Sequence, residues 1–177
     1  ADARFQPFGE TRMHPHHELD VISVMVEGRI SHEGSLEHGA SMGPREAQVQ
    51  RAGGEGFEHN EINPDKTWNR MLQLWVLPET PGERASYKKF KTKKGSTTRI
   101  YGGKPGLTAS FPAKTSIDVA LLNVGQTIVL DGSYYGYLSK GEAEIDGHIL
   151  EDGDLFKSAK VTLKATKESQ LIIIKSN

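Results

Sequence analysis

The chain has 177 residues, which is enough for one large β domain or two small ones and enough to bury a core. Its 22 basic and 23 acidic side chains nearly cancel, so the charge gives no support to a nucleic-acid surface or to binding of an anionic membrane. Cysteine is absent, which excludes a disulfide framework and a thiolate metal site. That absence is compatible with a reducing compartment, and a cytoplasmic location is expected. No apolar run approaches the roughly 18 residues of a membrane span.

The first motif that suggests chemistry is Arg-Met-His-Pro-His-His-Glu-Leu-Asp at residues 12–20. In an extended strand alternate side chains share a face, so His14 and His16 point the same way. Pro15 fixes its own φ and restricts His14 to extended geometry, which would pre-set the pair. A chance pair of this kind on a solvated strand is at least as common as a ligand pair, so the motif alone does not establish a metal site.

Three neighbours of this pair have different expected roles. His17 has the opposite parity and is not expected to be a metal ligand. Glu18 and Asp20 share the parity of His14 and His16. Glu18 is expected to turn outward, whereas Asp20 could be the hydrogen-bond partner of a ligand histidine.

Short strands and turns are expected between the first motif and the second. Val21–Val26 is rich in β-branched residues and predicts a strand, and Ala47–Gln50 predicts a shorter one. The segment Ser31–Ser41 is expected to be a loop with His32 and His38 on its surface. A place at the mouth of a pocket is the alternative for His32.

A second motif, Gly-Gly-Glu-Gly-Phe-Glu-His-Asn-Glu, spans residues 53–61. Its glycines permit the tight turns and bulges that aim a side chain inward, although an ordinary glycine-rich hairpin would use them too. Strand parity places His59 and Glu61 on one face. Imidazole nitrogens with a carboxylate form a donor set that Fe(II), Mn, Ni, Cu or Zn can use. The predicted metal ligands are therefore His14, His16, His59 and Glu61.

This donor set would leave one or two positions of an octahedral metal open. Open positions are what catalysis needs, and the absence of cysteine ligands argues against a structural zinc site. A stability clamp or a redox sensor is the alternative for a lone bound metal.

The chain is expected to divide after the first half. Residues 71–77 predict a buried strand, and two prolines with a glycine in residues 78–82 predict a boundary. We therefore expect a metal-binding domain over residues 1–82 and a second domain over residues 83–177. The basic run Tyr87–Lys94 is expected to be a solvated strand or linker face, with a phosphate-contacting strip as the alternative.

The second half repeats the β pattern without the metal-binding residues. Strands are expected over residues 117–124, 126–130 and 171–174. Asp146-Gly147 predicts a hairpin, and Tyr134–Tyr137 is expected to line a core or a cavity. Residues 130–133 offer no histidine where a second metal motif would fall, and His148 is expected to be exposed. This domain is expected to hold no metal.

Together these motifs resemble the pirin-like branch of the cupins. The resemblance is carried by His14-Pro15-His16, the carboxylate of Asp20, Gly28, the segment 54–61 and the apolar run 72–79. It is specific over residues 12–79 and topological beyond them. It implies an all-β bicupin of two tandem jelly-roll-type barrels, with the metal in the first barrel and with His14, His16, His59 and Glu61 as its ligands.

The chain departs from the family pattern in three respects. Asp20 stands where glutamate is usual, and Arg45 stands where glycine is usual. Pirin-like chains also carry more strands ahead of the first motif. The chain is therefore either a short member or one from which an N-terminal piece is missing. In the second case the first barrel would lack some N-terminal strands, and a partner chain could close it.

The resemblance implies two functions of different classes. The first is a dioxygenase that opens flavonols such as quercetin with O2, in which Glu61 would be the general base for the substrate's hydroxyl. Fe(II) is the expected metal, since neutral imidazoles, one carboxylate and open positions suit oxygen chemistry, with Zn, Mn, Ni, Cu or Co as alternatives. The second is a non-enzymatic metal-binding regulator with a protein partner. No helix-turn-helix or basic stripe supports contact with nucleic acid.

Overall fold

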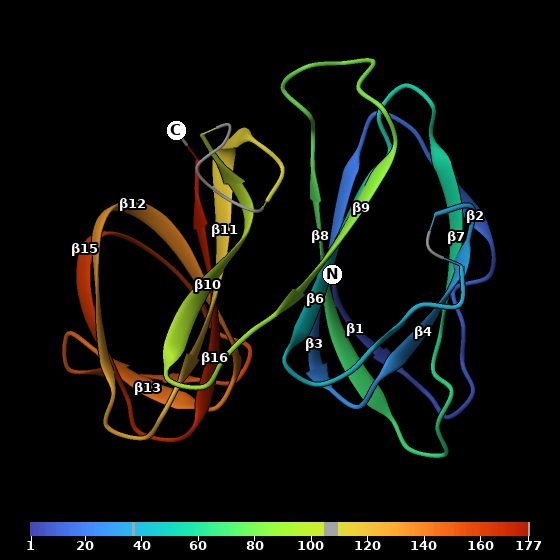
Figure 1. Cartoon of the computed structure of the whole chain (residues 1–177). Helices are drawn as coiled ribbons and strands as arrows, with labels where there is room; N and C mark the ends of the chain where they lie inside the picture. Colours follow the sequence, from blue (N-terminus) through green and yellow to red (C-terminus); the bar gives the residue numbers. More distant parts are fainter. Residues whose placement is uncertain (37, 105–109, 177) are drawn as a thin grey trace. The chain divides into compact units, whose positions relative to one another are not determined.

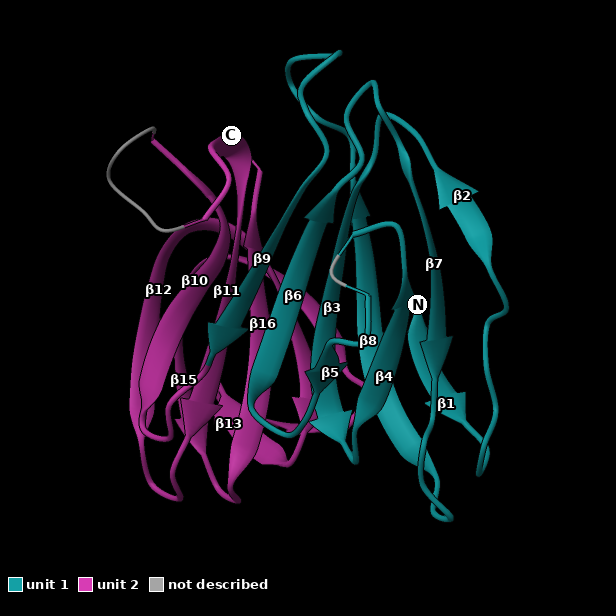
Figure 2. Cartoon of the chain, turned by 45° about the vertical axis from the view of Figure 1, so that its right-hand side comes forward, with its two compact units in different colours: residues 1–91 teal, residues 92–177 magenta. Residues whose placement is uncertain are grey.

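The computed structural model describes residues 1–36, 38–104 and 110–176, and the regular structure in these ranges consists of β-strands. The chain forms two compact units, the first from Ala1 to Lys91 and the second from Thr92 onward (Figure 2). The predicted all-β fold is confirmed. No helix in the described ranges is long and apolar enough to cross a membrane.

Unit 1 consists of two antiparallel sheets (Figure 1). Its strands are β1 (Asp2–Phe5), β2 (His14–His16), β3 (Asp20–Glu27), β4 (Ile30–Gly34), β5 (Ser41–Met42), β6 (Glu46–Arg51), β7 (Phe57–Ile62), β8 (Asn69–Val76) and β9 (Ser86–Lys91). One sheet has the order β1-β8-β3-β6-β9 and the other has the order β2-β7-β4-β5. Side chains of β3, β6 and β8 in the first sheet contact side chains of β7 in the second, so the two sheets enclose a shared interior.

The interior of unit 1 is apolar at one level and polar at the next. Met25 and Met71 belong to a buried apolar cluster, and one step further along the same strand faces lie Ser23 and Gln73. The register of β3 and β6 places Gln48 directly opposite Ser23, and both side chains are buried. Apolar burial supplies most of the stabilisation of such a barrel, so the polar level is the unusual part of this one.

Most of the strands expected in unit 1 are confirmed. The segments predicted around Val21–Val26, Ala47–Gln50 and residues 71–77 lie in β3, β6 and β8. The predicted loop Ser31–Ser41 was wrong in part, because its first residues belong to β4, which pairs with β7. His32 is consequently buried inside the barrel instead of lying on the surface.

The strand β9 follows the boundary that was expected at residue 82. It pairs with β6 over its whole length, from Ser86 opposite Arg51 to Lys91 opposite Glu46, and so belongs to unit 1. Residues 87–91 of the basic run therefore lie in the last strand of the five-stranded sheet. The metal-binding and metal-free roles of the two domains stay predictions.

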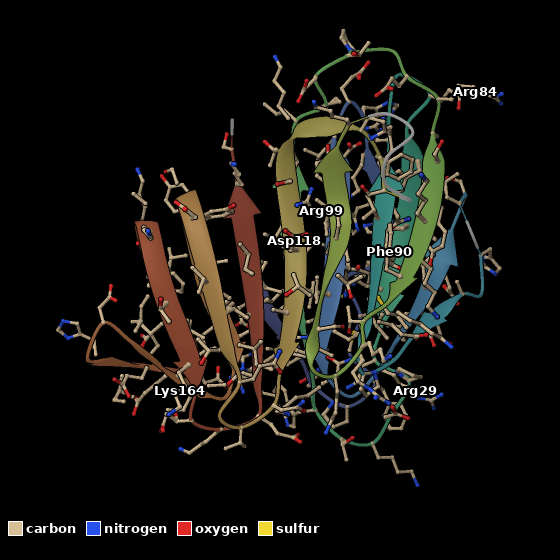
Figure 3. The ribbon with its side chains drawn as sticks, turned by 60° about the vertical axis from the view of Figure 1, so that its left-hand side comes forward. Arg29, Arg84, Phe90, Arg99, Asp118 and Lys164 are labelled. Atoms are coloured by element: carbon tan, nitrogen blue, oxygen red, sulfur yellow. The ribbon has the colours of Figure 1, made fainter. Side chains whose placement is uncertain are left out.

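Unit 2 is a single seven-stranded antiparallel sheet that curves around an apolar core (Figure 1). Its strands are β10 (Ser96–Gly103), β11 (Ala113–Leu122), β12 (Thr127–Lys140), β13 (Glu142–Ile145), β14 (His148–Glu151), β15 (Leu155–Ala165) and β16 (Ser169–Lys175). The predicted hairpin is confirmed: Asp146 and Gly147 join β13 to β14, both with positive φ as a type I′ turn requires. Arg99 of β10 and Asp118 of β11 lie side by side as an ion pair (Figure 3).

Candidate metal centre

The pairing of β2 with β7 brings the two sequence motifs together. His14 lies directly opposite His59 in this antiparallel pair, and the alternation of side chains puts His16 on the same face as His14. Left-handed residues stand on both sides of β2, at Arg12 with φ of 65° and at Glu18 with φ of 48°. The chain bends on each side of the histidine pair through these two residues. Non-glycine residues adopt the left-handed conformation only at an energetic cost.

Three ring nitrogens converge on one point inside the barrel. Nε2 of His59 lies 3.0 Å from Nε2 of His14 and 3.1 Å from Nε2 of His16. His59 is fully buried, His16 is 7 % exposed, and His14 is partly exposed. These residues, called here the three-histidine cluster, are the one group of histidine and acidic side chains in the described ranges that could hold a metal ion.

The hydrogen bonds made by Nδ1 of His14 and Nδ1 of His59 determine which ring nitrogen carries the proton. Nδ1 of His14 lies 2.8 Å from the carbonyl oxygen of Arg12, and Nδ1 of His59 lies 3.1 Å from Oε1 of Gln50. Both oxygens are acceptors, so each neutral ring carries its proton on Nδ1 and a lone pair on Nε2. Two lone pairs then face each other across 3.0 Å, and a cation between them would satisfy both.

The spacing of the nitrogens fits a transition metal. Ligand nitrogens about 2.1 Å from a common ion lie about 3.0 Å apart at adjacent octahedral positions and about 3.4 Å apart at tetrahedral ones. The observed 3.0 and 3.1 Å agree with the octahedral value. Three protein nitrogens on such an ion leave positions for further ligands.

Burial favours the neutral, metal-binding form of His59 and His16. It lowers the pKa of His59 to about 3, with further lowering from the neighbouring histidines. Burial also lowers the pKa of His16, and His14 adds to the effect. At neutral pH no proton competes for the nitrogen of His59, which removes part of the cost of metal binding.

Glu61 lies beside the three-histidine cluster but not within it. Its Oε1 accepts a hydrogen bond from the hydroxyl of Ser23 at 3.1 Å, and its Oε2 accepts one from the amide of Gln73 at 2.9 Å. Burial raises the pKa of Glu61 to about 7, against the lowering effects of Ser23, His14 and Gln73. Of the four predicted ligands, the structure brings three to one point and holds the fourth next to them on β7.

His32 lies inside the barrel, although the sequence pattern predicted it on the surface. This side chain is 1 % exposed, lies opposite Glu61 in the register of β4 and β7, and has its ring 5.5 Å from that of His59. Nε2 of His32 also lies 3.3 Å from the amide nitrogen of Gln50, the residue that contacts His59. The alternation of Ile30 with His32 was the signal that could have placed it inside.

Asp20, Glu18 and His17 take positions away from the cluster. Asp20 has the opposite parity to Ser23 and receives three hydrogen bonds from the guanidinium of Arg51, which do not support the possible role as partner of a ligand histidine. Glu18 does not share the inward face and accepts a hydrogen bond from the backbone of Gly82. His17 is exposed.

An antiparallel barrel with inward histidines on neighbouring strands defines a cupin-type metal protein. The Pirin family matches residues 5–76. A protein of Zymomonas mobilis, provisionally named a quercetin 2,3-dioxygenase, is 30 % identical over 98 % of this chain and 79 % of its own length. The chain belongs to the pirin family.

Solved structures show the same fold at lower sequence identity. The Escherichia coli pirin YhhW in complex with nickel(II) has a TM-score of 0.80 at 20 % identity, over 97 % of this chain and 76 % of that one. A quercetin 2,3-dioxygenase of Acinetobacter baumannii has a TM-score of 0.71 at 19 % identity, over 100 % of this chain and 72 % of that one. The prediction of two tandem cupin barrels is confirmed by this likeness.

Proposed function

We propose that the protein is a metal-dependent dioxygenase that opens flavonol-like aromatic substrates with O2. The observation that carries this proposal is the convergence of three Nε2 atoms at spacings of 3.0 and 3.1 Å, with lone pairs that a metal would satisfy. The names of the relatives in Zymomonas mobilis and Acinetobacter baumannii support the same chemistry.

The metal of the proposal is Fe(II), held by His14, His16 and His59, with Glu61 as the fourth ligand. Neutral imidazoles and one carboxylate with open positions suit iron–oxygen chemistry, although nickel and other divalent ions fit the same donors. When bound, the metal would supply the Lewis acidity and redox capacity that a reaction with O2 requires.

Glu61 is the proposed base for the substrate's hydroxyl proton. Its carboxylate is already oriented by donors from Ser23 and Gln73, so it loses little freedom when a substrate arrives. In the metal-free protein burial raises its pKa to about 7.

The test is oxygen consumption and carbon monoxide release with quercetin by iron-loaded protein under air. Glu61→Gln should keep part of its metal and lose about 10²–10⁴-fold in turnover, because an amide cannot accept the proton. Full turnover by this variant would remove Glu61 as the base. No turnover by fully iron-loaded wild type would overturn the enzyme and favour the regulatory metal-binding protein.

A further inference from the structure

Trp75 occupies an unusual position at the end of β8. It alternates with Gln73 and Met71, which places it on the strand face that looks into the barrel. Met71 is 1 % exposed and Gln73 is partly buried, but the Trp75 side chain is 61 % exposed. The indole therefore lies at the edge of the barrel interior, near the end of β8.

The indole is in contact with the three-histidine cluster. Its ring centroid lies 5.4 Å from that of His16, and the two planes meet at 76° in an edge-to-face arrangement. Beside it is a hollow of about 450 Å³ lined by Ala1, Gln73, Leu74 and Trp75.

A hydrogen bond fixes the orientation of the ring. Nε1 of Trp75 donates to Oε1 of Gln73 at 3.1 Å, and the amide nitrogen of Gln73 donates to Glu61 at 2.9 Å. The indole is thus held by His16 on one side and by an amide that is itself held by Glu61. An exposed aromatic ring that is fixed in this way can stack on a ligand at little cost in side-chain entropy.

We propose that Trp75 is a specificity-determining residue, on whose indole the planar ring of an aromatic oxygen chelator stacks while its oxygens reach the metal. The inference rests on the proposed function for the position of the chelating oxygens. It goes further in naming the residue that selects planar aromatic over aliphatic chelators. In such a ligand the flat ring system would stack on the indole of Trp75, and its hydroxyl and ketone oxygens would bind the metal held by the three histidines.

The experiment compares two ligands on nickel-loaded protein without O2, using calorimetric titration. Quercetin is the planar chelator, and acetohydroxamate is an aliphatic chelator that can bind through two oxygens without stacking. Trp75→Leu should weaken quercetin about tenfold, the loss of one aromatic stack with its buried area, and change acetohydroxamate less than about twofold. Trp75→Phe should keep most of the quercetin affinity, because a smaller ring remains.

Trp68 supplies the matched control, because it is the chain's other tryptophan and its side chain is 63 % exposed. Trp68→Leu should leave both affinities unchanged. Equal quercetin affinity in wild type and Trp75→Leu would overturn the proposal. An equal loss of affinity for quercetin and acetohydroxamate would also overturn it, because Trp75 would then only support the metal ligands.

Turnover is not part of this measurement. A tenfold split between the two ligands supports the stacking role even if quercetin is not oxidised, in which case the dioxygenase proposal alone fails. Conversely, turnover of quercetin with no split would retain the enzyme and remove Trp75 as its selector.

Discussion

Three glutamines of the five-stranded sheet, on strands β6 and β8, each have a different partner. Gln50 contacts Nδ1 of His59, Gln73 donates to Glu61, and Gln48 accepts from the hydroxyl of Tyr87. At the residue scale, therefore, identical side chains on one sheet face have different effects on the metal centre. The partners of a ligand histidine orient its ring and fix its tautomer, and this makes Gln50 the amide closest to metal binding.

Gln50→Leu should lower metal affinity about 10- to 100-fold, because Nδ1 of His59 loses its acceptor in a buried place. Gln48→Leu is the control, since Gln48 lies on the same strand face and is equally buried but contacts Tyr87. It should change the affinity by less than about threefold. Competition against a chelating dye measures both variants, and equal losses would show that Gln50 has no special role.

Glu61 should make the stability of the metal-free protein depend on pH. Its pKa is about 7 in the folded chain and about 4.5 when unfolded, so the folded state binds the proton more tightly. The resulting stabilisation is complete below pH 4.5 and is lost as the pH rises through 7. The loss is at most roughly 3 kcal/mol, since one pKa unit corresponds to about 1.4 kcal/mol.

The comparison is urea unfolding of wild type and Glu61→Gln at several pH values with a chelator present. Burial of His59 acts in the opposite direction, reducing stability as the pH falls below 6.5 toward 3, but it does so in both proteins. The free energy of unfolding of wild type should therefore fall relative to the variant as the pH rises. Parallel curves would show that Glu61 is solvated.

At the element scale, strand parity predicted the arrangement of His14, His16 and His59 because two motifs on antiparallel neighbours must present alternate residues to one face. Parity could not predict the distance of Glu61 from the nitrogens, which depends on donors from Ser23 and Gln73 in the opposite sheet. Those contacts join residues that are 38 and 12 positions from Glu61 in the sequence. Such tertiary hydrogen bonds leave no periodic signal.

The turn that leads into β6 carries an avoidable strain. Arg45 has a φ of 65°, a left-handed conformation that glycine adopts freely and that explains why glycine is expected there. Arg45→Gly should raise the free energy of unfolding by about 0.5–1 kcal/mol. Arg45→Ala keeps the Cβ and should give no gain. Thermal unfolding of the three proteins measures the changes in the free energy of unfolding. Equal changes in the two variants would show that the loss of the guanidinium, and not the relief of backbone strain, is responsible.

At the scale of the whole molecule, two β units differ in what they place inside. The interior of unit 2 is an apolar cluster, which includes Leu138, Leu163 and Leu171, whereas unit 1 buries a polar level next to its histidines. A shared strand architecture therefore does not imply shared chemistry.

The chain should consequently bind one transition metal ion, and the ion should depend on unit 1. His59→Ala should abolish binding, because it removes a buried ligand, whereas His17→Ala should retain it, because that ring is exposed and off the inward face. Metal analysis after dialysis gives the stoichiometry. Two ions per chain, or the same occupancy in both variants, would contradict the assignment.

The facing lone pairs of His14 and His59 also determine which ion the protein will carry when it is isolated. The affinity of a site with nitrogen and oxygen donors generally follows the Irving–Williams series, in which nickel and copper exceed iron. Protein passed over a nickel column would therefore exchange its native ion for the resin's. The metal found after purification would then reflect the ions met during purification. Expression and purification without competing ions would be needed to identify the metal that is bound in the cell.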